Sequence, residues 1–317
     1  MAEGPPAESG ADPATALPAG KTPFDHAIAA AERTVRANRF TVAVVFPLVG
    51  AVLLVASAEG LPTAAAVALL EPLGHAEAGR TVGAVLTFNA ALVMVGTLVM
   101  RSPLLVGVAP LLDRRAVAAL GTATLFTYAV EAVGVATDRP YGAFEYLVDL
   151  GPMVAGVPLG LPVFFLPLVV NAYLLTLLVL GGLADRRAVR LPATVAVVLA
   201  VDLVLDPGAV AIGFWAYDGG GAYYGVPASN YLGWLFSGTV AAALVDVAFD
   251  PDAVRARLDA CEFLLDDLVS FVLLWGAVNV LYGNPLAVAV AGLFVGGLVR
   301  SGRFDFDVVG AWNGVAR

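Results

Sequence analysis

The chain has 317 residues, of which 60% are hydrophobic and 14% are charged, and its formal net charge is −9. Soluble proteins carry about 25% charged residues, so apolar runs of this extent indicate an integral membrane protein. The absence of a basic stripe argues against nucleic-acid binding, and the lone cysteine, Cys261, excludes an internal disulfide and a cysteine-rich metal site.

The acidic sequence contains a single lysine, Lys21. An acidic, lysine-poor surface keeps a protein hydrated in high salt and favours a halophilic source, although a GC-rich genome gives the same preference for arginine.

The amino-terminal region divides into a tail and a helix. Residues 1–22 are rich in Ala, Gly, Pro and acidic residues and predict a disordered tail. Residues 23–38 carry Arg33 and Arg36 and predict a basic helix lying on the membrane surface. A single transmembrane catalytic domain is predicted over 39–301, followed by a short tail at 302–317.

Apolar segments near the length that crosses the hydrocarbon layer, roughly 20 residues, recur along the rest of the chain. They predict an all-α, polytopic transmembrane helix bundle in the cell membrane, in contact with lipid. The expected spans are 39–58, 81–100, 116–136, 159–183, 191–210, 230–249, 263–282 and 286–301. In the fifth span, Pro207 is expected to break or kink the helix.

The distribution of basic residues gives the orientation of these eight spans. All but two of the 17 Lys and Arg residues fall on one side of the eight-span arrangement, and the exceptions are Arg80 and Arg139. Basic residues are retained on the cytoplasmic side, so both termini are predicted to be cytoplasmic.

Two long outer connections, 137–158 and 211–229, are rich in Gly, Pro and aromatic residues. One interpretation is an aromatic belt at the headgroups, and the other is a shaped lid over a site. Lid formation is favoured by the length of both loops on one face.

Carboxyl groups inside a span are costly and therefore mark candidate sites. Glu131 lies in the outer half of the third span, and Asp202 and Asp206 share one face of the fifth. For Asn89, Asn171, Asn230 and Asn279, hydrogen bonds between helices are the preferred interpretation. Asp246 and Asp250, like Asp266 and Asp267, lie near helix ends and are expected to be solvated.

The buried acids suggest chemistry without a metal or a cofactor. His26 and His75 both lie outside the spans, and the sequence contains no nucleophile elbow or phosphate-binding loop. A carboxyl group in an apolar setting can remain a neutral acid near pH 7, as protonation of an unactivated alkene requires. A second carboxylate can orient water and accept its proton.

The loops carry motifs whose order and spacing resemble those of the membrane carotenoid hydratases. These motifs are YGAFEY at 141–146, GVPL at 156–159, DLVLDP at 202–207, GFW at 213–215, YYGVP at 223–227 and NYLGW at 230–234. The similarity extends over roughly residues 39 to 300 and is sharpest between 130 and 235.

The resemblance implies that water is added to both ends of a C50 carotenoid, converting bisanhydrobacterioruberin to bacterioruberin. Protonation of a trisubstituted alkene would give a tertiary cation, which water captures. Other membrane enzymes of the carotenoid pathway are further expected partners. Glu131 or Asp202 is the expected acid and Asp206 the expected base, with these roles exchangeable. Predicted substrate contacts are Tyr128, Tyr141, Trp215, Tyr223, Tyr224, Asn230, Trp234 and Asn171.

Two other functions are consistent with intramembrane acids. A prenyltransferase could hold magnesium and diphosphate through the DxxxD spacing of Asp202 and Asp206, repeated at Asp246 and Asp250, but the predicted topology places the two pairs at opposite faces. A carotenoid-binding or transport protein could use the acids as proton relays, although no internal repeat of spans is evident.

Overall fold

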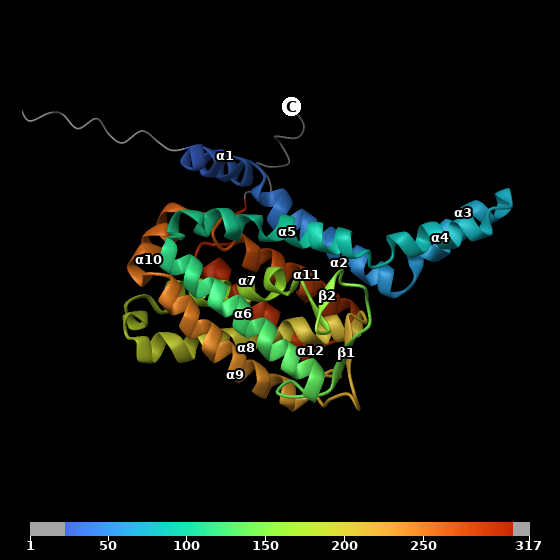
Figure 1. The fold of residues 1–317 in the computed structure, drawn as a ribbon. Coiled ribbons are helices and arrows are strands. Elements are labelled where there is room, and N and C mark those ends of the chain that lie inside the picture. Colours follow the sequence, from blue (N-terminus) through green and yellow to red (C-terminus); the bar gives the residue numbers. More distant parts are fainter. Residues whose placement is uncertain (1–22, 307–317) are drawn as a thin grey trace, which may run out of the picture.

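The computed structural model describes residues 23–306, so the predicted disordered tail and the end of the 302–317 tail lie outside the described residues. The described part is built from α-helices with four short strands, which confirms the all-α class (Figure 1). The helices are α1 (Pro23–Ala37), α2 (Phe46–Ala58), α3 (Leu61–Leu70), α4 (Ala76–Leu86), α5 (Ala90–Val108), α6 (Arg114–Thr137), α7 (Leu161–Leu180), α8 (Arg187–Ala211), α9 (Ala228–Ala248), α10 (Pro251–Ala260), α11 (Asp266–Tyr282) and α12 (Pro285–Arg300). The strands are β1 (Phe144–Tyr146), β2 (Met153–Val154), β3 (Val157–Pro158) and β4 (Trp215–Tyr217).

Six helical stretches among residues 23–306 are long and apolar enough to cross a membrane. They are Thr41–Ala58, Ala76–Leu111, Arg114–Thr137, Leu161–Asp185, Arg187–Ala211 and Ala228–Ala248. Helices α11 and α12, with 17 and 16 residues, are shorter than the roughly 20 residues of a typical span. The six stretches indicate a multi-pass membrane protein, whereas eight spans and cytoplasmic termini stay predictions.

The second predicted span, 81–100, is not one continuous helix, because α4 and α5 are separated at residues 87–89. The side chain of Asn89 accepts hydrogen bonds from the backbone N–H groups of Ala91 at 3.0 Å and Leu92 at 3.2 Å. These bonds satisfy N–H groups that the start of a helix leaves unpaired. Asn89 is therefore a polar cap that begins a new helix within an apolar run. It was expected to hydrogen-bond to another helix, and the bonds that it accepts come from its own helix instead.

Helices α3 and α4 form a hairpin that projects from one end of the bundle (Figure 1). Gly79 and Gly83 allow the two helices to approach closely. A Cβ atom on Gly83 would lie 2.3 Å from the Cα atom of Thr63, which leaves no room for a side chain. The hairpin is thus held by backbone contact, like small-residue packing between membrane helices.

Helix α8 continues through Pro207, so of the predicted break or kink the break is wrong and the kink stays a prediction. Proline lacks the N–H group that would bond to the carbonyl oxygen of Leu203, four residues earlier. Instead, the hydroxyl of Tyr223 donates to that oxygen at 3.1 Å. Asn279 on α11 donates to the neighbouring carbonyl of Val204 at 2.8 Å, which confirms its predicted role between helices. Side chains from outside α8 thereby satisfy its backbone around the proline.

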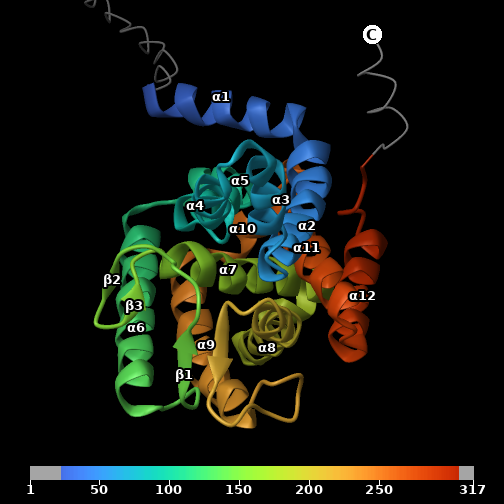
Figure 2. The same cartoon turned by 90° about the vertical axis from the view of Figure 1, so that its right-hand side faces the viewer.

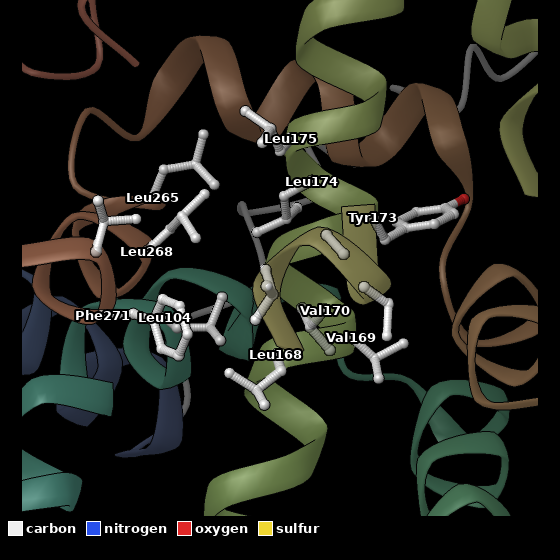
Figure 3. Packing of buried hydrophobic residues seen from close by; sticks show 14 of the residues in the cluster. Leu104, Leu168, Val169, Val170, Tyr173, Leu174, Leu175, Leu265, Leu268 and Phe271 are labelled. Atoms are coloured by element: carbon white, nitrogen blue, oxygen red, sulfur yellow. The ribbon is translucent and has the colours of Figure 1, made fainter. Parts of the chain in front are cut away.

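The centre of the bundle lies around α7 and the start of α11. Figure 3 shows the leucine and valine side chains of α7 packed against residues of α11 and α5. The labelled side chains include Leu168, Val169, Val170, Leu174, Leu175, Leu265, Leu268, Phe271 and Leu104. Lipid tails are as apolar as leucine, so in a bilayer this core is stabilised by close packing more than by escape from water.

Two antiparallel strand pairs lie at the end of the bundle where α6 and α8 finish (Figure 2). Strand β1 follows α6, β4 follows α8, and the two pair with Phe144 opposite Tyr217 and Tyr146 opposite Trp215. Strands β2 and β3 form a smaller pair. The β1–β4 pair connects the ends of the two helices that carry the predicted acids.

Candidate active site

A cavity of about 550 Å³ lies beneath the β1–β4 pair and extends between the helices. Its walls come from helices α2 to α9, from α11 and from the two long loops, and most of its side chains are apolar or aromatic. The charged residues among them are Arg101, Glu131 and Asp206. Apolar walls with a few convergent polar groups are typical of small-molecule sites, and here they suit a lipophilic ligand.

Asp202 and Asp206 lie one turn apart on α8 and are buried, with exposed fractions of 1% and 2%. Asn230, near the start of α9, donates its side-chain N–H groups to both, at 3.0 Å to Asp202 and 2.5 Å to Asp206. Because the same amide nitrogen bonds to an oxygen of each aspartate, the two carboxyl groups lie close together. Asp206 lines the cavity, whereas Asp202 lies behind it.

Each cavity-lining acid accepts a hydrogen bond from a tyrosine of the strand pair. The hydroxyl of Tyr146 donates to Glu131 at 2.5 Å, and that of Tyr217 donates to Asp206 at 3.0 Å. Burial, reinforced by the nearby carboxylates, raises the pKa of both phenols far above their usual range. Both tyrosines therefore remain protonated donors at neutral pH.

The β1–β4 pair presents an aromatic surface to the cavity. Directly opposed residues of antiparallel strands, and residues two apart in one strand, share a face. This register places Phe144, Tyr146, Trp215 and Tyr217 on one face, and all four line the cavity. Glu145, between two of them, points to the other face and is exposed.

Residues 88–298 match the model of the carotenoid biosynthesis protein family. The chain belongs to this family. It is also similar to bisanhydrobacterioruberin hydratase of Haloarcula japonica, with 55% identity over 293 residues that cover 92% of each chain. No solved structure matches the chain significantly. The part of the chain that matches the family includes Glu131, Asp202, Asp206, Asn230 and the strands β1 and β4, whereas α2, which forms one cavity wall, precedes it.

Four of the eight predicted substrate contacts line the cavity of this family member: Tyr141, Trp215, Asn230 and Trp234. Trp234 stacks on Phe165, with ring centroids 5.2 Å apart. Tyr146 and Tyr217 were not among the predicted site residues. Both belong to the aromatic loops, and their contacts with the acids depend on the β1–β4 register, which three-residue strands do not reveal in a sequence.

The other four predicted contacts do not line the cavity. The hydroxyl of Tyr128 donates to the carbonyl of Leu159, and Tyr223 bonds to α8 as described. Tyr224 accepts a hydrogen bond from the N–H group of Leu286 at 3.0 Å. Asn171 donates to Asp267 at 2.5 Å. These polar groups are engaged in contacts within the protein, so the cavity geometry does not favour them as ligand contacts.

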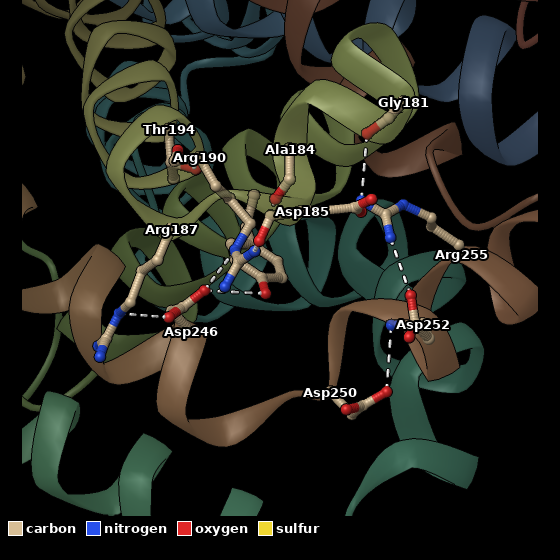
Figure 4. Close-up of polar contacts among 11 residues, drawn as sticks. Gly181, Ala184, Asp185, Arg187, Arg190, Thr194, Asp246, Asp250, Asp252 and Arg255 are labelled. Atoms are coloured by element: carbon tan, nitrogen blue, oxygen red, sulfur yellow. Dashed lines mark hydrogen bonds and ion pairs between the residues drawn. The ribbon is translucent and has the colours of Figure 1, made fainter.

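Asp246 is not at a solvated helix end, contrary to prediction. It is 7% exposed and forms ion pairs with Arg190 at 2.6 Å and with Arg187 at 2.9 Å (Figure 4). Asp250 does match the prediction, because it is exposed and caps α10. Both arginines belong to the first turn of α8, whereas Asp246 lies near the end of α9.

Asp266 and Asp267 are also fully buried, and the prediction of solvated ends is wrong for both. Arg39 donates to the two oxygens of Asp266 at 2.8 and 3.0 Å. Arg101 donates to those of Asp267 at 2.8 and 3.0 Å. Arg101 was expected at the end of a span, but α5 continues beyond it, so the charge requires a partner inside the bundle.

Proposed function

We propose that this protein adds water to the terminal double bonds of the C50 carotenoid bisanhydrobacterioruberin, without a metal or an organic cofactor, to give bacterioruberin. The supporting observation is that this chain is 55% identical, over 92% of its length, to bisanhydrobacterioruberin hydratase of Haloarcula japonica. The cavity adds a physical argument. A lipophilic alkene fits apolar walls, and a buried carboxyl group can deliver a proton away from competing bulk water.

Asp206 is the proposed proton donor. Asp202 and Asp206 are buried and bind the same amide nitrogen, so ionising both would place two like charges side by side in an apolar setting, and the pair is proposed to hold one proton between them. Only Asp206 faces the cavity, which favours it as the group that meets the alkene. Asp202 then acts through Asp206. On sequence grounds Asp206 was the expected base, with the roles of acid and base exchangeable. Here Asp206 takes the role of the acid.

Glu131 is the proposed base. The alkene electrons take the proton from the aspartate pair to form a C–H bond, which leaves a tertiary cation. The oxygen of a water molecule bonds to the cation, and Glu131, oriented by Tyr146, accepts the proton that this water loses. Return of that proton to the aspartate pair restores the protein, so each turnover consumes one water molecule and one double bond.

The rings of the strand pair are proposed to stabilise the cation. Aromatic faces attract positive charge by about 2 kcal/mol in a desolvated setting. Phe144, Trp215 and the two tyrosines lie over the acids on one surface of the β1–β4 pair. A cation formed beside Asp206 would therefore meet ring faces as well as the carboxylates.

For the membrane, we propose eight spans with cytoplasmic termini and the cavity in the outer half of the bundle. The partition of basic residues supports this orientation. The short α11 is the seventh span in this arrangement. Its high burial in the bundle is compatible with a short length, because neighbouring helices cover it.

Prenyl transfer through the two DxxxD motifs is disfavoured by the positions of the acids. Asn230, which holds the first pair, and Asp246 lie on the same helix 16 residues apart, or about 24 Å. Asp246 is also occupied by two arginines. Acids so far apart could not bind one diphosphate.

Membranes that contain bisanhydrobacterioruberin and the expressed protein provide the test. We expect its conversion to products with one and then two added hydroxyl groups, whose oxygen comes from heavy-oxygen water. Membranes without the protein serve as the control. Unchanged substrate in the presence of folded protein would contradict the proposal, and a transport or binding protein would give that result.

The substitution Tyr217→Phe tests the hydrogen bond to Asp206. We expect turnover to fall roughly 10- to 100-fold, because a hydrogen bond to a charged group contributes about 1.5–3 kcal/mol. Tyr224→Phe is the matched control, because that hydroxyl lies outside the cavity. Chromatography of the pigments gives the rates. Equal activity of both variants and the native protein would show that Tyr217 does not position the acid.

A further inference from the structure

The cavity is elongated and has its acids at one end. Along α5 its lining runs from Leu92 to Arg101, and along α2 it runs from Ser57 to Phe46. At 1.5 Å per residue these walls are about 14 and 16 Å long. Glu131 and Asp206 lie toward the loop end, so the tunnel leads from the acids to a floor near the middle of the bundle.

The cavity also has an apolar mouth. Leu53 of α2, Leu86 of α4 and Leu92 of α5 line the cavity, yet 61%, 50% and 59% of their surfaces are exposed. An opening bordered by exposed leucines on membrane helices faces hydrocarbon rather than water. The exposed leucines of the adjoining α3–α4 hairpin, Leu61, Leu69 and Leu73, continue this apolar surface outward.

The cavity is too short for a whole C50 carotenoid. Its walls along α5 and α2 measure about 14 and 16 Å, well below the length of an extended C50 polyene. Part of the polyene must therefore remain outside, and the apolar mouth allows it to lie in the bilayer.

The two ends of the cavity are chemically different. Acids occur at the loop end, whereas the charged group at the floor is Arg101, which is bound to Asp267. A guanidinium group is always protonated and cannot transfer a proton to an alkene. A single binding event can therefore bring only one end of the substrate to the carboxyl groups.

We infer that the protein hydrates one end of the polyene in each binding event. The carotenoid enters from the bilayer between α2, α4 and α5, reacts at one end, and leaves with a single new hydroxyl group. It must then rebind in the opposite direction before the second end reacts. This inference rests on the proposed hydration and specifies how a substrate with two reactive ends is processed.

A time course with the purified protein in lipid nanodiscs and excess bisanhydrobacterioruberin tests this inference. We expect the mono-hydrated carotenoid to accumulate to many times the protein concentration before the doubly hydrated product appears. Fresh substrate added midway should delay the second hydration by competition. Doubly hydrated product from the first turnover, with the mono-hydrated form below the protein concentration, would overturn the inference. Absence of any hydration would instead contradict the proposed function.

Gly96→Phe tests whether the polyene occupies the tunnel. Gly96 lines the cavity on α5, and a Cβ atom there would have its nearest neighbour, the Cε1 atom of Phe46, at 3.8 Å. The variant can thus fill the tunnel without moving the acids, and we expect turnover of the C50 substrate to fall at least tenfold. Gly121→Phe on the exposed face of α6, with no atom within 4 Å, is the control. Native turnover in a folded Gly96→Phe protein would overturn this binding mode.

Discussion

Asp206→Asn is expected to lower carotenoid hydration by about 10²- to 10⁴-fold, because an amide cannot donate the proton that a general acid supplies. Asp206 is the aspartate of the pair that faces the cavity, so no neighbouring aspartate can take its place.

We expect Asp202→Asn to reduce turnover less, since Asp202 acts through Asp206. Glu131→Gln should reduce it strongly, because the water then lacks its base. Product analysis at early times measures all three rates.

Two exposed acids of the same loops provide matched controls. Asp218 follows Tyr217 directly, and Glu145 lies between two cavity-lining residues of β1 but on its other face. Asp218→Asn and Glu145→Gln should both retain native turnover. Thermal unfolding of each variant in detergent shows whether the fold is kept. A folded Asp206→Asn protein with native activity would remove Asp206 from the mechanism.

The acids of the site could be predicted because burial of charge leaves a signal in a membrane sequence. Glu131, Asp202 and Asp206 interrupt apolar segments, and such residues are rare enough to be singled out. Their partners Tyr146 and Tyr217 lie in loops where aromatic residues are common. Only the pairing of β1 with β4 brings them to the acids, and strands of three residues carry too little alternation to predict it.

The errors at the other end of the bundle have a different cause. An acid at the start of a helix is usually solvated, which led to the wrong expectation for Asp266 and Asp267. Their partners, Arg39 and Arg101, are 227 and 166 residues away, so no local spacing reveals the ion pairs. The positive-inside rule also treats an arginine as a loop marker. Arg101 does not lie in a loop, because apolar residues on both sides of it extend α5.

Breaking the Arg101–Asp267 ion pair is expected to cause the largest loss of stability. Both side chains are buried, and Arg101 donates to both oxygens of Asp267. Asp267→Asn leaves the guanidinium charge buried without a counter-charge, which costs about 3–5 kcal/mol in a protein interior. We expect a clear drop in the unfolding temperature of the detergent-solubilised protein. Glu77→Gln, which breaks the exposed pair with Arg80, is the control and should leave that temperature unchanged.

A double variant separates the cost of an unpaired charge from the value of the pair itself. Replacing a buried ion pair by apolar residues of similar volume is often neutral or stabilising. Arg101→Met combined with Asp267→Leu should therefore recover most of the stability that Asp267→Asn loses. Asn171, which also donates to Asp267, would then lack that acceptor, so Asn171→Leu in the same background should complete the recovery. If the double variant is as unstable as Asp267→Asn, the pair itself holds α5 against α11, and the unpaired charge is not the cause.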